Sequence, residues 1–165
     1  MRSLRMGVVL CLIALIFSCY STRPLQYDVT FDYDVDYNFA RVSSYDWLTM
    51  PGTSKIDRFN RIRIQSAVAE ELQPKGLKRT SRNPDVLIVM YGGDFKEVNT
   101  AVLKIDYDVY DVGRLKLAFY DGQSKEEVWW GETRADLFYN MSADQLDETI
   151  DGAVKRILEH YPPTR

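Results

Sequence analysis

Cys19 is the side chain with the clearest chemistry in this sequence, because the residues before it place a thiol at the end of an export signal. Arg2 and Arg5 form a positively charged start, and residues 6–17 form an almost unbroken apolar run. A small residue, Ser18, comes directly before Cys19. This order of a basic, an apolar and a small-residue region is typical of a cleavable signal peptide.

The residues Ile16-Phe17-Ser18-Cys19 resemble the lipobox of bacterial lipoproteins. That resemblance implies a thioether between diacylglycerol and the Cys19 sulfur, uptake of palmitate, and cleavage before Cys19. We therefore expect residues 1–18 to be a signal peptide and residues 19–26 to be a lipidated tether. An ordinary secretory signal cut elsewhere is one alternative. An uncleaved anchor is another, although the apolar run is shorter than the ~20 residues of a membrane-spanning helix.

Residues 32–38 have the beginning of a calcium-loop pattern, with Asp or Asn at every second position. The sixth position of that loop needs Gly and holds Tyr37, and the twelfth needs Glu and holds Ser43. Alternating carboxylates also fit the solvent face of a strand. His160, the single histidine, has no cysteine or obvious acid partner in the sequence. We therefore expect no catalytic residues, no metal site and no cofactor.

Trp129 and Trp130 are a candidate interaction surface. Adjacent strand residues point to opposite faces, so one tryptophan should lie in the core and the other on the outer face. The sequence does not decide which one is exposed, and an exposed tryptophan is a common interface anchor. A second candidate is residues 55–82, where basic side chains outnumber acidic ones. This excess could meet anionic head groups or form an ordinary solvated surface.

Composition favours one exported domain. The 165-residue chain is still the size of a single domain after loss of residues 1–18. Its net charge of −3 gives no reason to expect a nucleic-acid partner. Cys11 lies in the signal and Cys19 would be acylated, so no disulfide is expected. The many aromatic residues, 11 Tyr, 7 Phe and 3 Trp, suit a sheet-rich fold.

Hydrophobic periodicity predicts an α+β fold over residues 27–163, with two helices packed on one face of a largely antiparallel sheet. Residues 27–39 alternate apolar and polar side chains, which predicts a long first strand. Ser142 and Gln145 form a capping-box pair that predicts the start of the last helix. Turns are expected at Gly92-Gly93, at Val112-Gly113 and over residues 121–124. The other expected elements are strands 44–48, 77–80, 86–91, 98–110, 114–120 and 126–137, and a helix over residues 56–73.

Several blocks of the sequence carry a family resemblance. They are Tyr27–Leu48, Gly76 with Pro84–Val89, Arg114–Asp121, Val128–Gly131 and Ala153–Pro163. In this order they resemble the Domain of Unknown Function 4136 family of bacterial envelope lipoproteins. The resemblance implies an α+β sheet domain on a lipid tether in the bacterial cell envelope, and it implies no activity.

These features together predict a non-enzymatic binding or scaffold module, held to a membrane through Cys19 and paired with an unknown envelope protein. A binder of hydrophobic small molecules or lipids is the alternative, with aromatic side chains lining a cleft between helices and sheet. Tyr20 and Ser21 follow the cysteine, and no Asp stands where an inner-membrane retention signal would have it. In a host with two membranes we therefore expect the outer membrane, with the domain in the periplasm.

Overall fold

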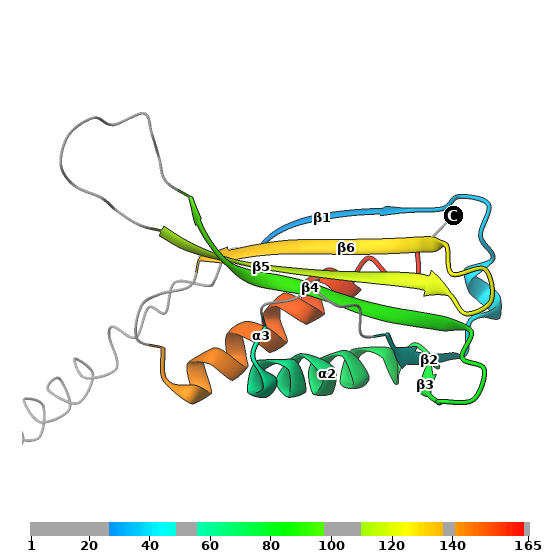
Figure 1. Ribbon diagram of the computed structural model, residues 1–165, viewed down its shortest axis with the longest axis horizontal. Coiled ribbons are helices and arrows are strands. Elements are labelled where there is room, and N and C mark those ends of the chain that lie inside the picture. The colour runs from blue at the N-terminus through cyan, green and yellow to red at the C-terminus, as the bar shows by residue number, and fades with distance from the viewer. Residues whose placement is uncertain (1–26, 49–55, 98–109, 137–140, 164–165) are drawn as a thin grey trace, which may run out of the picture.

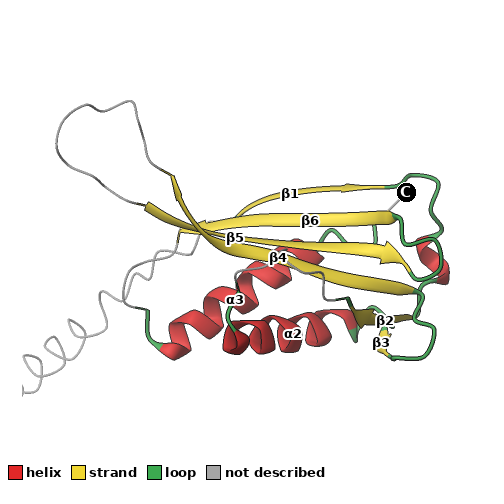
Figure 2. Ribbon diagram, viewed as in Figure 1, coloured by secondary structure: helices red, strands yellow, loops and turns green. Residues whose placement is uncertain are grey.

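Six strands form one mixed sheet, and two helices lie side by side on one of its faces (Figures 1 and 2). The computed structural model describes residues 27–48, 56–97, 110–136 and 141–163. The strands follow one another across the sheet in the order β1-β6-β5-β4-β2-β3. The elements are β1 (Asp28–Tyr33), the 3-10 turn η1 (Phe39–Arg41), β2 (Ser44–Trp47), α2 (Arg58–Leu72), β3 (Lys78–Arg79), β4 (Val86–Glu97), β5 (Tyr110–Asp121), β6 (Glu127–Asp136) and α3 (Ala143–Leu158).

The pairing of the strands confirms the expected fold class. Strands β4, β5, β6 and β1 pair antiparallel in turn, and only β2 runs parallel to its neighbours β3 and β4. Both helices pack on the same side of this sheet, which makes the described chain a two-layer α+β domain. No helix among the described residues is long and apolar enough to cross a membrane.

Local capping residues start both helices, and α2 begins two residues later than the sequence predicts. The Asp57 carboxylate accepts hydrogen bonds from the amides of Phe59 and Asn60 at the start of α2. The expected capping box between Ser142 and Gln145 is present at the start of α3. Such caps supply partners for the amides that a helix leaves unpaired in its first turn.

The core lies between the sheet and the helices and contains a cluster of aromatic rings. Tyr161, which follows α3, stacks on Phe119 with ring centroids 4.5 Å apart. Trp129 meets both rings edge to face, at 5.1 Å from Phe119 and 5.3 Å from Tyr161. All three side chains are fully buried. This cluster packs the segment that follows α3 against β5 and β6.

The first strand ends at Tyr33 and not at residue 39, so the last part of that prediction is wrong. The Asp34 amide still donates to the Val128 carbonyl at 2.9 Å, and the Tyr37 amide then turns back to the Asp34 carbonyl. β6 extends to Glu127, past Trp129, the last partner of β1, so the strand ends because the chain turns at Asp34, whose carboxylate also accepts from the Asp36 amide at 2.9 Å. The side chain of Tyr37 turns into the core instead.

Two expected turns are also wrong, because β4 and β5 are longer than the sequence suggests. β4 continues through Gly92-Gly93 to Glu97, and β5 begins at Tyr110 and includes Val112-Gly113. Each of these residues has a partner across the sheet. A Cβ atom on Gly92 would lie 2.7 Å from the Ile56 side chain, so the glycine here serves a close approach. Most of the expected strand 98–110 lies outside the described residues.

Candidate functional site

The two adjacent tryptophans separate as strand geometry requires. Trp129 has no exposed surface and belongs to the core, so it is not part of an interaction surface. Trp130 is half-buried and lies on the outer face, the side of the sheet away from α2 and α3. The role of Trp130 in an interaction stays a prediction. Cys19 lies outside the described residues.

The outer face of β5 brings a lysine to Trp130. Leu117 and Phe119 are buried on the helix side, so Lys116 points outward. The Lys116 Nζ lies 4.6 Å from the centroid of the Trp130 ring and 5.6 Å from that of Tyr91 on β4. Both distances allow an attraction between the ammonium and the ring faces. Three strands therefore contribute to one cation–aromatic arrangement.

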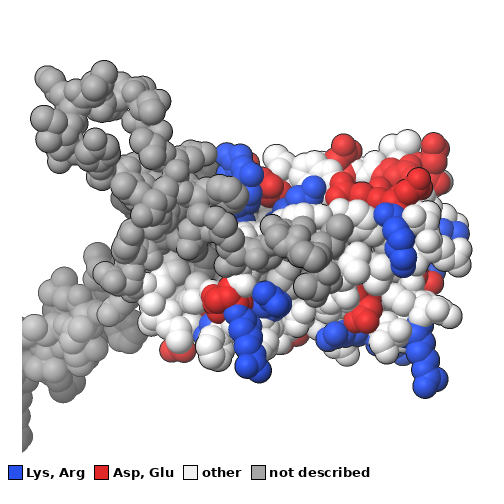
Figure 3. Space-filling model, viewed as in Figure 1, with Lys and Arg blue, Asp and Glu red and all other residues white. Residues whose placement is uncertain are grey.

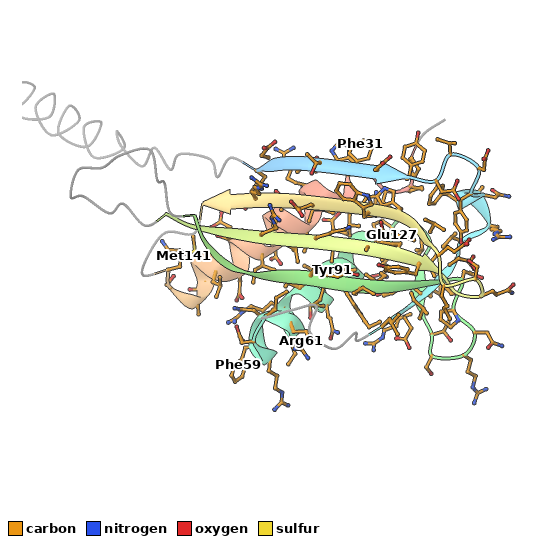
Figure 4. All side chains as sticks on the ribbon, turned by 45° about the horizontal axis from the view of Figure 1, so that its top comes forward. Phe31, Phe59, Arg61, Tyr91, Glu127 and Met141 are labelled. Carbon is orange, nitrogen blue, oxygen red and sulfur yellow. The ribbon has the colours of Figure 1, made fainter. Side chains whose placement is uncertain are left out.

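A chain of hydrogen bonds extends this arrangement along the same face. The Tyr91 and Tyr120 hydroxyls lie 2.9 Å apart, and the Tyr120 hydroxyl donates to Glu127 Oε2 at 3.2 Å. Glu127 Oε2 also lies 3.6 Å from Lys116 Nζ. Burial, followed by the hydrogen bond to Tyr91, raises the pKa of Tyr120 above its usual value. We refer to Tyr91, Lys116, Tyr120, Glu127 and Trp130 as the outer-face cluster; Figure 4 labels Tyr91 and Glu127.

Charged side chains continue beside the cluster. Glu132 Oε1 lies 3.2 Å from Arg114 Nε and 4.0 Å from Arg134 Nε. The face therefore offers large rings that contact apolar or planar groups, together with charges of both signs that give orientation. Sequence reasoning identified Trp130 but not Lys116 or Tyr91. The missing information is the register of β4, β5 and β6, which puts residues from three strands together.

A polar cleft of about 540 Å³ lies at the end of the sheet where β5 ends and β4 begins. Its lining includes Tyr37, Arg41, Asp85, Asp121 and Gln123. Asp121 is buried, and its Oδ2 accepts hydrogen bonds from the Tyr37 hydroxyl at 3.0 Å and from Arg41 Nη2 at 3.4 Å.

Asp85, the second carboxylate of the cleft, joins two loops. Its Oδ2 accepts from the amides and the hydroxyls of both Ser43 and Ser44, at 2.8 to 3.0 Å. These bonds, first the one from the Ser43 amide, hold the pKa of Asp85 below its usual range. The amides of Ser124 and Gln123, with Tyr37 and Arg41, do the same for the pKa of Asp121, against the opposing effect of burial. Both carboxylates are therefore ionised and already hold several donors, which fits a structural role.

Tyr161 is a core residue close to Tyr37 and Asp85 of this cleft. It is buried, and its hydroxyl has no hydrogen-bond partner among the described residues. Burial, and then the negative charges of Tyr37 and Asp85 when ionised, raise its pKa. Tyr161 therefore stays neutral and acts as a packing residue. No three His, Cys, Asp or Glu side chains of the described segments form a group that could hold a metal ion.

The sequence matches one protein family over nearly all of the described residues. The match covers residues 29–163, and the family is described as Domain of unknown function (DUF4136). The chain belongs to this family. The resemblance found in the sequence blocks is thereby confirmed, and family membership assigns no activity. No curated protein matches the sequence.

Solved structures share the fold. A PDZ domain protein from Parabacteroides distasonis is 18% identical with a TM-score of 0.57; the match covers 86% of this chain and 37% of that one. This chain thus spans little more than a third of that protein. The PelC dodecamer from Paraburkholderia phytofirmans is 12% identical with a TM-score of 0.54, and the match covers 81% of this chain and 96% of PelC. At these identities the likeness concerns the fold alone.

Proposed function

We propose that this protein is a lipid-anchored domain of the bacterial cell envelope that works by binding another envelope protein through the outer-face cluster. The export signal ending at Cys19 supports the anchor and the location. The observation that carries the binding role is the arrangement of half-buried Trp130, Tyr91 and Lys116 on a sheet face that neither described helix covers.

The geometry of the cluster suits protein recognition. Tryptophan and tyrosine contribute much of the binding energy at many interfaces, where the surrounding contacts exclude water. Charged groups at such an interface set the orientation of the partner. Lys116 already holds the rings of Trp130 and Tyr91, and the hydrogen bond to Tyr120 holds Tyr91 from the other side. Side chains ordered before binding lose less conformational entropy when a partner arrives.

The fold likeness to PelC supports an assembly role by analogy, because PelC is a dodecamer. The finer location that we propose is the outer membrane, with the domain facing the periplasm in a host that has two membranes. Tyr20 and Ser21 after the anchor carry no acidic retention signal, which supports this location.

The competing proposal, a binder of hydrophobic small molecules, needs aromatic side chains that line a cleft between helices and sheet. Phe119, Trp129 and Tyr161 in this layer instead contact one another and are buried. The described polar cleft is lined by charged side chains such as Arg41 and Asp121. These observations favour protein binding by the outer face over ligand binding in the layer.

Site-specific crosslinking in living cells tests the proposal. A photoreactive phenylalanine analogue replaces Trp130 in one strain and Phe31 in another; Phe31 is an exposed aromatic residue on the edge strand β1. We expect one defined envelope protein, identified by mass spectrometry, to be captured at position 130 and not at position 31. Capture at position 130 should fall at least fivefold when Lys116→Glu is added.

Two results would overturn the binding role. The first is the absence of a reproducible adduct at position 130 across growth phases. The second is equal capture of the same protein at positions 31 and 130, which would mean that the outer-face cluster does not direct the contact. The Lys116→Glu background separates a specific contact from mere proximity.

A further inference from the structure

Two large apolar side chains are exposed on the first turns of α2. Phe59 is 72% exposed and Ile62 is 51% exposed. They are three residues apart, so they lie on the same side of the helix. The buried residues Ile64 and Val68 lie on the other side and face the sheet. The start of α2 therefore carries apolar side chains on two faces. The face with Ile64 packs in the core, whereas the face with Phe59 and Ile62 is exposed.

Arginines border this exposed apolar pair. Arg58 and Arg61 are both exposed, and Arg61 uses one nitrogen to donate to the Ile56 carbonyl at 3.3 Å. Arg63 differs, because its guanidinium turns to α3 and bonds to Asp147. We refer to Arg58, Phe59, Arg61 and Ile62 as the α2 outer patch. Figure 4 shows Phe59 and Arg61 at the same end of the helix.

The patch lies at the end of the molecule where the chain comes in from its N-terminal segment. Ile56, just before α2, lies over Gly92 of β4. Residues paired across neighbouring strands connect Gly92 to the beginning of β1. In order across the sheet they are Gly92, Leu115, Thr133 and Val29. Tyr27, which precedes β1, and the start of α2 therefore share one end of the domain (Figure 1).

We propose that the α2 outer patch rests on the phospholipid surface to which the protein is anchored. Phe59 and Ile62 enter the boundary between head groups and acyl chains, and Arg58 and Arg61 pair with lipid phosphates. This inference rests on the lipid anchor proposed above. Residues 19–26 would reach about 27 Å at ~3.4 Å per residue, which keeps the patch within range of the surface.

Acidic side chains gather on one side of the opposite end of the domain, at which exposed Lys78, Arg79 and Arg82 also lie. Asp32, Asp34 and Asp36 are exposed at the end of β1 and in the turn after it, and Figure 3 shows acidic side chains gathered there. Phosphate groups repel these carboxylates. Asp57 is the acid nearest to the patch in the sequence, and its carboxylate is occupied by the first amides of α2. The acidic turn after β1 is therefore poorly suited to a contact with anionic lipid, whereas the α2 outer patch is not.

Fluorescence quenching in vesicles tests the orientation. The mature chain would contain a single cysteine, Cys19, whose sulfur is acylated, so an introduced cysteine is the only free thiol. Ser66→Cys places an environment-sensitive label one turn beyond Ile62, and the matched control Ser81→Cys places it at the far end; both serines are exposed. The full-length lipidated protein is reconstituted in vesicles of phosphatidylethanolamine and phosphatidylglycerol that contain lipids spin-labelled near the head group.

We expect the label at position 66 to be quenched at least threefold more than the label at position 81. The double variants Phe59→Ser with Ile62→Ser, and Arg58→Glu with Arg61→Glu, should each remove most of that difference. All four substituted side chains are exposed, so both double variants should keep the thermal unfolding midpoint of the parent protein. Equal quenching at the two positions, or stronger quenching at position 81, would overturn the proposal.

Mass spectrometry of the same preparation separates this inference from the anchor. A diacylglyceryl group on Cys19 together with equal quenching would leave the anchor standing and overturn the patch. A chain without lipid that still binds vesicles, with the label at position 66 preferentially quenched, would overturn the anchor and support the patch as a membrane contact in its own right.

Discussion

The Tyr37 hydroxyl donates a 3.0 Å hydrogen bond to Oδ2 of Asp121, and this bond joins the turn after β1 to the end of β5. The two residues are distant in the sequence, and both are buried. Asp121 Oδ1 accepts from the amides of Gln123 and Ser124 at 2.8 Å, which holds the turn between β5 and β6. One carboxylate therefore organises two connections at the same end of the sheet.

Removal of this carboxylate should cost more than removal of the hydroxyl. Tyr37→Phe deletes one hydrogen bond and should lower the free energy of unfolding by about 1 kcal/mol. Asp121→Ala leaves the hydroxyl, the guanidinium and two amides without their acceptor and should cost about 3 kcal/mol. Urea unfolding of both variants at neutral pH measures the difference. Equal losses would mean that Asp121 acts only through Tyr37.

The stability of the domain should fall in acid. Hydrogen bonds hold the pKa values of Asp85 and Asp121 below their usual range, first those from the Ser43 amide and the Ser124 amide respectively. Groups with a depressed folded pKa stabilise the fold above their unfolded pKa of about 3.9, and this stabilisation is lost as the pH falls through the folded value. Urea midpoints between pH 7 and pH 2.5 should show the loss, and Asp85→Asn with Asp121→Asn should flatten it.

Local signals in the sequence predicted the start of α3 well, because a cap acts over a few residues. Ser142 and Gln145 bond to each other's backbone amides as the pattern requires. The first strand shows the limit of such signals. Its alternating pattern continues to Phe39, but a turn closed by the Tyr37 amide on the Asp34 carbonyl ends the strand at Tyr33. The alternating pattern does not reveal this turn, because Asp34 and Tyr37 fit the polar and apolar positions of a strand equally well.

The outer-face cluster could be predicted only in part, because it depends on the register of three strands. The adjacent pair Trp129-Trp130 predicted one ring in the core and one on the outer face, and the structure places Trp130 on the outer face. Lys116 meets Trp130 through the register of β5 with β6, and Tyr91 through the register of β4 with β5. Because a turn was expected at Val112-Gly113, the predicted strand was shorter than β5. Its registers with β4 and β6 could therefore not be predicted.

Alanine substitutions should separate the two tryptophans. Trp129→Ala removes a fully buried ring that contacts Phe119 and Tyr161, so it should lower the free energy of unfolding by about 3–5 kcal/mol. Trp130→Ala removes a half-buried ring from the outer face and should cost about 1 kcal/mol, mainly through its contact with Lys116. Denaturant unfolding gives both values. A larger loss for Trp130→Ala would place that ring in a second buried layer.

Gly122 should be one of the least tolerant positions in the chain. A Cβ atom there would lie 1.9 Å from the Pro84 carbonyl oxygen, and the Gly122 amide donates to the Asp85 carbonyl at 2.8 Å. The obstacle is backbone, so Gly122→Ala should destabilise the fold by about 3 kcal/mol. Gly76→Ala is the control; it meets no atom within 4 Å and carries only the cost of a positive φ, about 1 kcal/mol. Similar thermal midpoints for the two variants would contradict this reasoning.

Cys19→Ser tests the anchor directly, because thioether formation requires a thiol that serine does not have. We expect labelled palmitate to enter the wild-type protein and not the variant, and we expect the variant to keep residues 1–18 because cleavage follows lipidation. The described fold begins at residue 27, so the stability of the domain should not change. Membrane fractionation on a sucrose gradient gives the location of the wild-type protein. Wild-type protein without palmitate, found free in the periplasm or the medium, would identify residues 1–18 as an ordinary secretory signal.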